Sequence, residues 1–133
     1  MTIFIDSSFL FALFNDDDEF HQKAVKTAKK LEKKAIRFLI SNIVIAEAVN
    51  LAFRLKGVGA SRKMFNLIEK SGIEKVFVDQ KVYSQAYDLL FIQKSKRGLN
   101  FFDCLHLSTM KYLNIENILT FDRAFEKEVK VID

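Results

Sequence analysis

The chain has 133 residues, of which half are hydrophobic and 29% are charged; this composition suits one compact domain and is not typical of a disordered protein. Its 21 Lys and Arg residues exceed its 17 Asp and Glu residues, so the formal net charge is +4 and the isoelectric point lies near 9.2. This modest excess favours a polyanionic partner such as nucleic acid, although Lys-rich surfaces also serve solubility alone.

Cysteine content and hydropathy indicate the cellular compartment. The single cysteine, Cys104, excludes an intramolecular disulfide, and its position in an apolar run predicts a buried thiol. No stretch is long and apolar enough to predict a membrane span, and the chain starts without the basic segment of a secretory signal. We therefore expect a cytoplasmic protein.

Apolar periodicity predicts strands that alternate with helices. Strands are expected at residues 2–5, 36–40, 75–78, 117–120 and 129–132. Helices are expected over residues 7–14, 19–34, 42–56, 61–70 and 82–95, and from residue 101 onward. Ser41 or Asn42 can cap the third helix, Asn100 can cap the last, and Gly57 with Gly59 should separate the third from the fourth. This alternation predicts a single α/β domain over residues 1–133, with a mainly parallel sheet of four to five strands.

Four carboxylates lie within or directly after apolar runs. Asp6 and Asp122 follow predicted strands, at the edge of the sheet where α/β proteins build ligand sites, while Glu47 and Asp103 fall on predicted helices. A carboxylate in apolar surroundings is costly unless it is paired, neutralised or bound to a metal. Because no Lys or Arg lies in the same runs, and Mg²⁺ and Mn²⁺ prefer oxygen ligands, the four acids predict a divalent-metal site for phosphodiester hydrolysis by water.

Each acid also has a structural explanation. Asp6 can cap the helix that follows it, and Glu47 can pair with a basic residue of its own helix. Asp103 can stabilise the positive end of a helix dipole, and Asp122 can start a turn. A phosphoacceptor signalling domain also places Asp residues at strand ends, but the acid pair and the Lys that it needs are not evident here. Because all four structural explanations must hold together, we favour the metal site.

The four acids stand in short motifs that together resemble those of the PIN-domain ribonucleases and, among their small members, the VapC-type toxins of toxin–antitoxin pairs. The motifs are IDSS (residues 5–8), SNIVIAE (41–47), NFFDCL (100–105) and TFDRAF (120–125). The order and context of the motifs, over nearly the whole chain, carry the resemblance. Asn100 departs from it, since Ser or Thr is more frequent at that position.

The resemblance implies a PIN-like three-layer sandwich and an endoribonuclease that depends on Mg²⁺ or Mn²⁺. It assigns catalysis and metal binding to four residues, namely Asp6, Glu47, Asp103 and Asp122. It implies supporting hydroxyls at Ser7 and Thr120, a homodimer, and a small antitoxin that covers the active-site cleft. Two alternatives stay open: a PIN-like scaffold that binds RNA or protein without cutting, and an RNA-processing nuclease outside a toxin–antitoxin pair.

Other polar residues receive less specific predictions. The acidic run at residues 16–18 is expected to be a solvated turn, and His21 and His106 are expected to have structural roles. Three basic residues that precede the Asp103 helix are expected to contact RNA phosphates. These residues are Lys94, Lys96 and Arg97.

Overall fold

The protein is built around a five-stranded sheet, and the computed structural model describes residues 1–95 and 97–132. The strands are β1 (Thr2–Ile5), β2 (Arg37–Ser41), β3 (Glu74–Val76), β4 (Asn117–Leu119) and β5 (Lys130–Val131). They lie in the order β3-β2-β1-β4-β5, and every neighbouring pair is parallel. The predicted parallel sheet is therefore confirmed.

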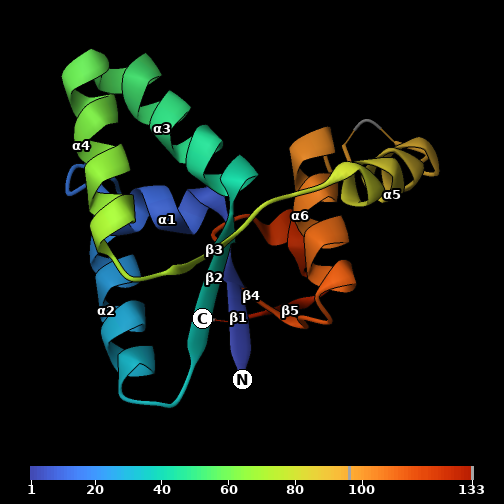
Figure 1. Ribbon diagram of the computed structural model, residues 1–133, viewed down its shortest axis with the longest axis horizontal. Helices are drawn as coiled ribbons and strands as arrows, with labels where there is room; N and C mark the ends of the chain where they lie inside the picture. The colour runs from blue at the N-terminus through green and yellow to red at the C-terminus, as the bar shows by residue number, and fades with distance from the viewer. Residues whose placement is uncertain (96, 133) are drawn as a thin grey trace.

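Helices cover both faces of this sheet. They are α1 (Ser7–Phe14), α2 (His21–Glu32), α3 (Asn42–Lys56), α4 (Val58–Lys70), α5 (Gln80–Phe91), α6 (Phe101–Tyr112) and the 3-10 helix η1 (Arg123–Phe125). Figure 1 shows the sheet nearly edge-on, with α1 to α4 on one side and α5 and α6 on the other. The predicted α/β three-layer sandwich is thus confirmed. None of the helices in the described ranges has the length and apolar character that crossing a membrane requires.

Side-chain caps begin α1 and α3, which follow strands directly, and α6, which follows α5. Asp6 caps α1, Ser41 caps α3 and Asn100 caps α6. Of the two candidates for α3, Ser41 is the cap because the side-chain oxygen of Asn42 accepts a hydrogen bond from the Val78 backbone N–H at 2.8 Å instead. These caps fix where each chain segment turns at the sheet edge.

The predicted start of α4 and both predicted ends of α5 are wrong. Gly57 alone ends α3, because its φ of +90° turns the chain in a way that favours glycine, and α4 then begins at the next residue. Gly59 therefore lies inside α4, and the expected start at Ser61 is too late. The next helix begins and ends earlier than expected, because Asp79 caps it and it stops at Phe91.

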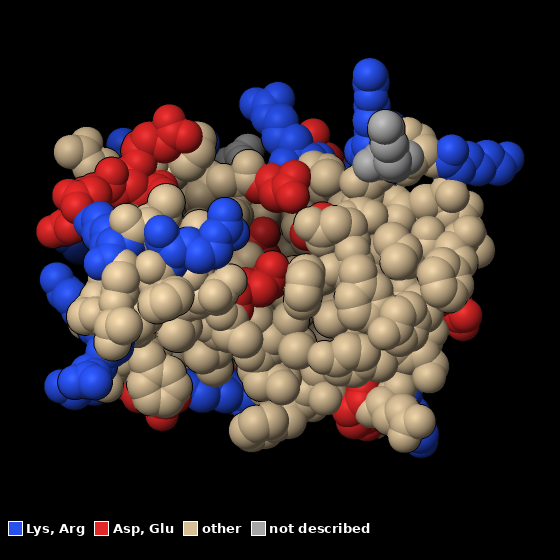
Figure 2. All heavy atoms as spheres, turned by 90° about the horizontal axis from the view of Figure 1, so that it is seen from above, with Lys and Arg blue, Asp and Glu red and all other residues tan. Residues whose placement is uncertain are grey.

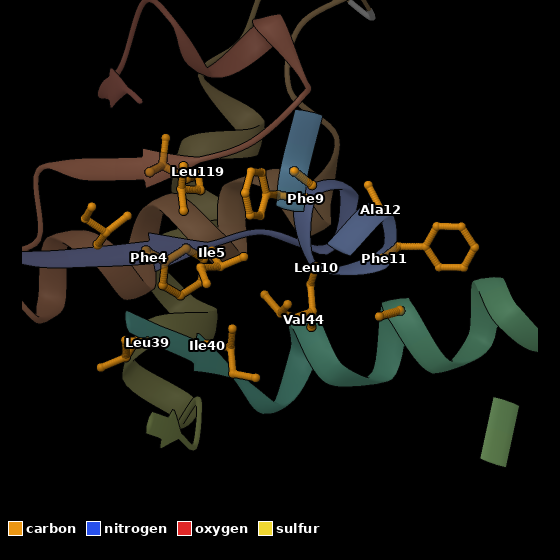
Figure 3. Packing of buried hydrophobic residues seen from close by; sticks show 14 of the residues in the cluster. Phe4, Ile5, Phe9, Leu10, Phe11, Ala12, Leu39, Ile40, Val44 and Leu119 are labelled. Atoms are coloured by element: carbon orange, nitrogen blue, oxygen red, sulfur yellow. The ribbon is translucent and has the colours of Figure 1, made fainter. Parts of the chain in front are cut away.

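The main core lies between the sheet and the helices of one face. Phe4 of β1, Leu10 of α1 and Val44 of α3 are fully buried. Figure 3 shows Leu10 and Val44 extending toward one another between their helices, beside the strands. Cys104 is buried in a smaller cluster on the other face, between α5 and α6. The predicted buried thiol is confirmed, and both faces of the sheet hold their helices by apolar packing.

Candidate active site

The acids predicted from the sequence gather at the carboxyl edge of the sheet. Strand β1 is central. Strand β2, the next strand in the chain, pairs with it on one side, and β4 pairs with it on the other. The gap between the connections of β1 and β4 is the place where α/β sheets bind ligands. Asp6 follows β1, and its N–H donates to the Leu119 carbonyl at the end of β4, at 3.1 Å. Figure 2 looks onto this edge and shows acidic side chains in and around a central hollow.

Asp6 is buried and held by three donors. Its Oδ1 accepts hydrogen bonds from the Phe9 N–H at 3.0 Å and from the Ser8 hydroxyl at 2.8 Å, and its Oδ2 accepts one from the Thr120 hydroxyl. Burial raises the pKa of Asp6, while the three hydrogen bonds act in the opposite direction. The sequence assigned the supporting hydroxyl to Ser7, but the serine that contacts Asp6 is Ser8.

A hydroxyl pair connects the start of α1 to the loop after β4. The Ser8 and Thr120 hydroxyl oxygens lie 3.3 Å apart. Ser8 Oγ accepts from the Phe121 N–H at 3.0 Å, and Thr120 Oγ1 accepts from the Asp122 N–H at 2.9 Å. Since the same hydroxyls donate to Asp6, they fix Asp122 relative to Asp6 across the two strands. Asp122 also caps η1 through the Ala124 N–H, which is the turn-starting role that its sequence position allows.

Asp103 stands in the first turn of α6, within a capping box. The Asn100 side-chain oxygen accepts from the Asp103 N–H at 2.9 Å, and Asp103 Oδ2 accepts from the Asn100 N–H at 3.1 Å. The pKa of Asp103 is raised to about 6, chiefly by burial and also by the negative charges of Asp122 and Glu47. The hydrogen bond from the Asn100 backbone and the nearby His106 act in the opposite direction. Asp103, Asp122 and Glu47 are therefore close enough to act on one another electrostatically.

Glu47 of α3 pairs with a histidine of α6. Its Oε1 lies 2.6 Å from His106 Nε2, and the exposed fractions of the two side chains are 27% and 2%. The other ring nitrogen of His106, Nδ1, is buried without a hydrogen-bond partner in the described structure. Because a carboxylate oxygen accepts, His106 Nε2 is the donor in this contact with Glu47. The sequence analysis missed this pair, although the three-residue spacing from Asp103 to His106 places both on one side of α6.

The donor set fits a hard dication. The ion pairs in residues 1–95 and 97–132 involve none of Asp6, Asp103 and Asp122, so no basic side chain there neutralises these acids at ion-pair distance. Within the same ranges no three His, Cys, Asp or Glu side chains form a ready-made cage for a metal ion. Carboxylates that repel one another and have a raised pKa are stabilised when a dication enters between them, and oxygen donors suit Mg²⁺ and Mn²⁺.

The remaining polar residues lie apart from these acids or flank them. Asp17 pairs with a lysine at the surface, as expected for a solvated turn, and His21 Nδ1 lies 2.7 Å from the Ala12 carbonyl, where it joins α2 to α1. Lys94 and Arg97 are exposed in the connection between α5 and α6. Lys96 lies outside the described residues.

The architecture and the acids at its switch point define an α/β protein of the PIN-nuclease class. The model of the PIN domain family matches residues 3–129, so this chain belongs to the PIN domain family. The resemblance and the enzyme class predicted from the sequence are confirmed. No curated protein sequence matches the chain significantly.

Solved structures of toxins and toxin–antitoxin complexes share this fold. VapC20 of Mycobacterium tuberculosis, a toxin that cleaves the sarcin–ricin loop, is 26% identical, with a TM-score of 0.82 over 94% of this chain and 93% of that one. VapBC2 of Rickettsia felis, bound to a promoter DNA fragment, is 16% identical, with a TM-score of 0.75 over 99% and 98%. FitAcB of Neisseria gonorrhoeae is 15% identical, with a TM-score of 0.66 over 100% and 97%.

Proposed function

We propose that this protein is a divalent-metal-dependent endoribonuclease that hydrolyses RNA phosphodiester bonds and acts as the toxin of a toxin–antitoxin pair. The observation that carries the proposal is the arrangement of four acids from distant parts of a PIN-family chain. Thr120 links Asp6 to Asp122, and the charges of Asp122 and Glu47 act on Asp103. The likeness to VapC20, which spans almost the whole of both chains, supports an RNA substrate and a toxin role.

The side chains of this protein have distinct roles in that activity. Asp6, Glu47, Asp103 and Asp122 would hold Mg²⁺ or Mn²⁺. An ion held there would supply Lewis-acid chemistry, namely a more acidic water for attack on phosphorus and positive charge for the departing oxygen. Thr120 orients Asp6 by donating to its Oδ2. Asp103, Asp122 and Glu47 each use one carboxylate oxygen in the hydrogen bonds of the described residues, which leaves their second oxygen for the ion.

The phosphate backbone of RNA is negatively charged, and it must approach a largely acidic hollow to reach this site. Basic residues at its margin would attract and position the phosphate backbone without selecting a base sequence. Lys94 and Arg97 are exposed just before α6, whose first turn carries Asp103, and Lys96 lies between them in sequence. We assign phosphate contacts to these three residues.

An antitoxin and a second copy of the chain are the proposed protein partners. VapBC2 and FitAcB support the antitoxin, because these neighbours of the same fold are toxin–antitoxin complexes. Large apolar side chains are exposed around α5, among them Phe77 at 86% and Phe91 at 73%. Figure 2 shows that the part of this face over α5 and α6 is nearly free of charged side chains. Such a surface suits a protein interface. Sedimentation of the purified chain measures its mass in solution and so tests the homodimer.

Cleavage of mixed cellular RNA tests the enzyme. The purified protein is incubated with Mg²⁺, Mn²⁺ or EDTA, beside Asp6→Asn and Asp103→Asn, with the exposed Asp88→Asn as a charge-matched control. We expect metal-dependent cutting by the wild type and the control, and none by the two site variants. Cutting that survives EDTA or either site substitution would contradict the mechanism. A folded protein that binds Mn²⁺ and cuts no RNA would favour the non-catalytic scaffold.

Inhibition tests the toxin role separately. We expect a small reading frame beside the gene, whose product co-purifies with this protein and blocks its RNA cleavage. If the protein cuts RNA and no neighbouring product binds it, the RNA-processing alternative is favoured.

A further inference from the structure

A stack of three aromatic rings leads from the core to the surface beside the acids. The ring of buried Phe9 stacks on that of Phe121, with centroids 5.3 Å apart and planes inclined by 22°. Phe121 in turn stacks on Phe20, at 4.7 Å and 16°. Phe20 lies just before α2 and keeps 41% of its surface exposed. The stack therefore ends in a ring that is accessible from solvent.

This stack lines a cavity next to the candidate metal site. The cavity has a volume of about 250 Å³, and Phe9, Phe20 and Phe121 all contribute to its wall. One water occupies roughly 30 Å³ of liquid, so the space is large enough for a planar nucleobase. Thr120 and Asp122 line the same cavity, which places it beside the acid that follows β4.

Two basic side chains accompany the aromatic wall. Lys23 and Arg123 both line the cavity, and Lys23 Nζ lies 5.9 Å from the centroid of the Phe121 ring. The carboxylates that line it are Asp122 and Glu126. Aromatic rings with neighbouring cations are the combination by which proteins hold single-stranded nucleic acid, since rings stack on bases and cations bind phosphates.

Stabilisation of the start of α2 does not explain why residue 20 is Phe. It occupies the N-cap position of α2 and makes no side-chain hydrogen bond there. Ser, Thr, Asp or Asn would stabilise that helix start, and Phe does not. Packing on Phe121 uses one face of the Phe20 ring, and the exposed remainder borders the cavity.

We propose that Phe20, with Phe121 and Lys23, forms a nucleobase subsite for the RNA strand. The base next to the scissile phosphate stacks on Phe20, and Lys23 contacts the adjoining phosphate. This inference rests on the proposed ribonuclease function and adds a defined place for one nucleotide. Because stacking accepts any base, the subsite orients the strand more than it selects a sequence.

Binding of a short oligoadenylate tests the subsite, with an abasic ribose–phosphate chain of the same length as the second probe. Fluorescence anisotropy in EDTA measures binding without cleavage. We expect Phe20→Ala to weaken oligoadenylate binding by about 5- to 100-fold, the range that stacking of one base supplies, and Phe20→Tyr to restore most of it. The control Phe65→Ala removes a similarly exposed ring from α4 and should leave binding unchanged.

The abasic chain separates stacking from a general loss of structure. Phe20→Ala should leave its affinity unchanged, because no base is present to stack. An equal loss with both chains, or no loss with oligoadenylate, overturns the subsite. The chain contains no Trp, so Phe20→Trp introduces a single indole, which can be excited selectively beside the three Tyr. Oligoadenylate should quench its fluorescence and the abasic chain should not.

The two proposals fail in distinguishable ways. If Phe20→Ala cuts RNA with Mn²⁺ and binds oligoadenylate as the wild type does, the subsite is overturned and the nuclease stands. If binding depends on Phe20 as expected but no RNA is cut with either metal, the nuclease is overturned and the subsite stands.

Discussion

Replacing Asp103 by Asn should stabilise the metal-free protein. The pKa of Asp103 rises from 3.8 to about 6 on folding, chiefly through burial. Between these values the folded protein binds more protons than the unfolded chain, so the free energy of unfolding falls as the pH rises through this window. Above about pH 6 this decrease in the free energy of unfolding is complete. The neutral Asn side chain does not ionise, so the variant does not lose this stability.

The size of the effect follows from the same pKa values. The difference between 3.8 and about 6 corresponds to about 3 kcal/mol if it is fully retained. Asp103 is only partly buried, and solvent screens its charge, so we expect a gain of about 1 to 2 kcal/mol. The Asn side-chain oxygen can still accept from the Asn100 N–H, so the variant keeps that part of the capping box.

Urea denaturation in EDTA measures the gain, with Asp88→Asn as the control on an exposed position of α5. The Asp103→Asn variant should exceed the wild type at about pH 7.5 and match it at about pH 2.5, below both pKa values, where the wild-type carboxyl is protonated in both states. Saturating Mn²⁺ should reverse the order, because a ligand at 100 times its dissociation constant adds about 2.7 kcal/mol to the protein that binds it. A variant that is less stable than the wild type at about pH 7.5 in EDTA would refute this reasoning.

Three further predictions concern the same site. Mn²⁺ should bind the wild type more weakly as the pH falls through about 6, because Asp103 must lose its proton, and calorimetry should find this dependence reduced in Asp103→Asn. Thr120→Val should lower the free energy of unfolding by about 1 to 2 kcal/mol near neutral pH, because Asp6 loses a buried hydrogen-bond donor. Thr109→Val, which removes a hydroxyl that donates to the Leu105 carbonyl, should lower the free energy of unfolding by less, and equal losses would contradict this. His106→Leu should weaken Mn²⁺ binding by roughly tenfold or more, because His106 donates to Glu47 and so fixes the position of that carboxylate. His106→Gln keeps a side-chain donor and should weaken binding by less. Unchanged Mn²⁺ affinity in His106→Leu would show that His106 does not position Glu47.

Most of the fold follows from local signals in the sequence. The apolar runs at Thr2–Ile5 and Asn117–Leu119 are short and have polar residues at their ends, so their identity as strands was predictable. Caps such as Asn100 marked helix starts in the same way. The boundary between α3 and α4 was not predictable from glycine content, because the turn depends on the φ of Gly57, which a neighbouring glycine does not share.

The acids of the site were predictable because carboxylates in apolar runs are rare, but their partners were not. Glu47 meets His106 across 59 positions of sequence, and packing of α3 against α6 decides that contact. The choice of Ser8 over Ser7 depends on which hydroxyl the first turn of α1 directs toward Asp6. The Glu47–His106 contact is tertiary, and the Ser8–Asp6 contact depends on the backbone geometry at the start of α1. Neither residue type nor spacing along the chain specifies them.

The strand order also determines when the site can exist during synthesis. Central strand β1 is made first, but its neighbour β4 and the acid that follows it come more than a hundred residues later. A nascent chain that has released only its first half can form β1 and β2, and it lacks Thr120 and Asp122. Pairing across so long a separation also waits for the intervening chain to collapse. The proposed hydrolytic centre can therefore assemble only after Asp122 has left the ribosome, and we expect translation products truncated before Asp122 not to cut RNA.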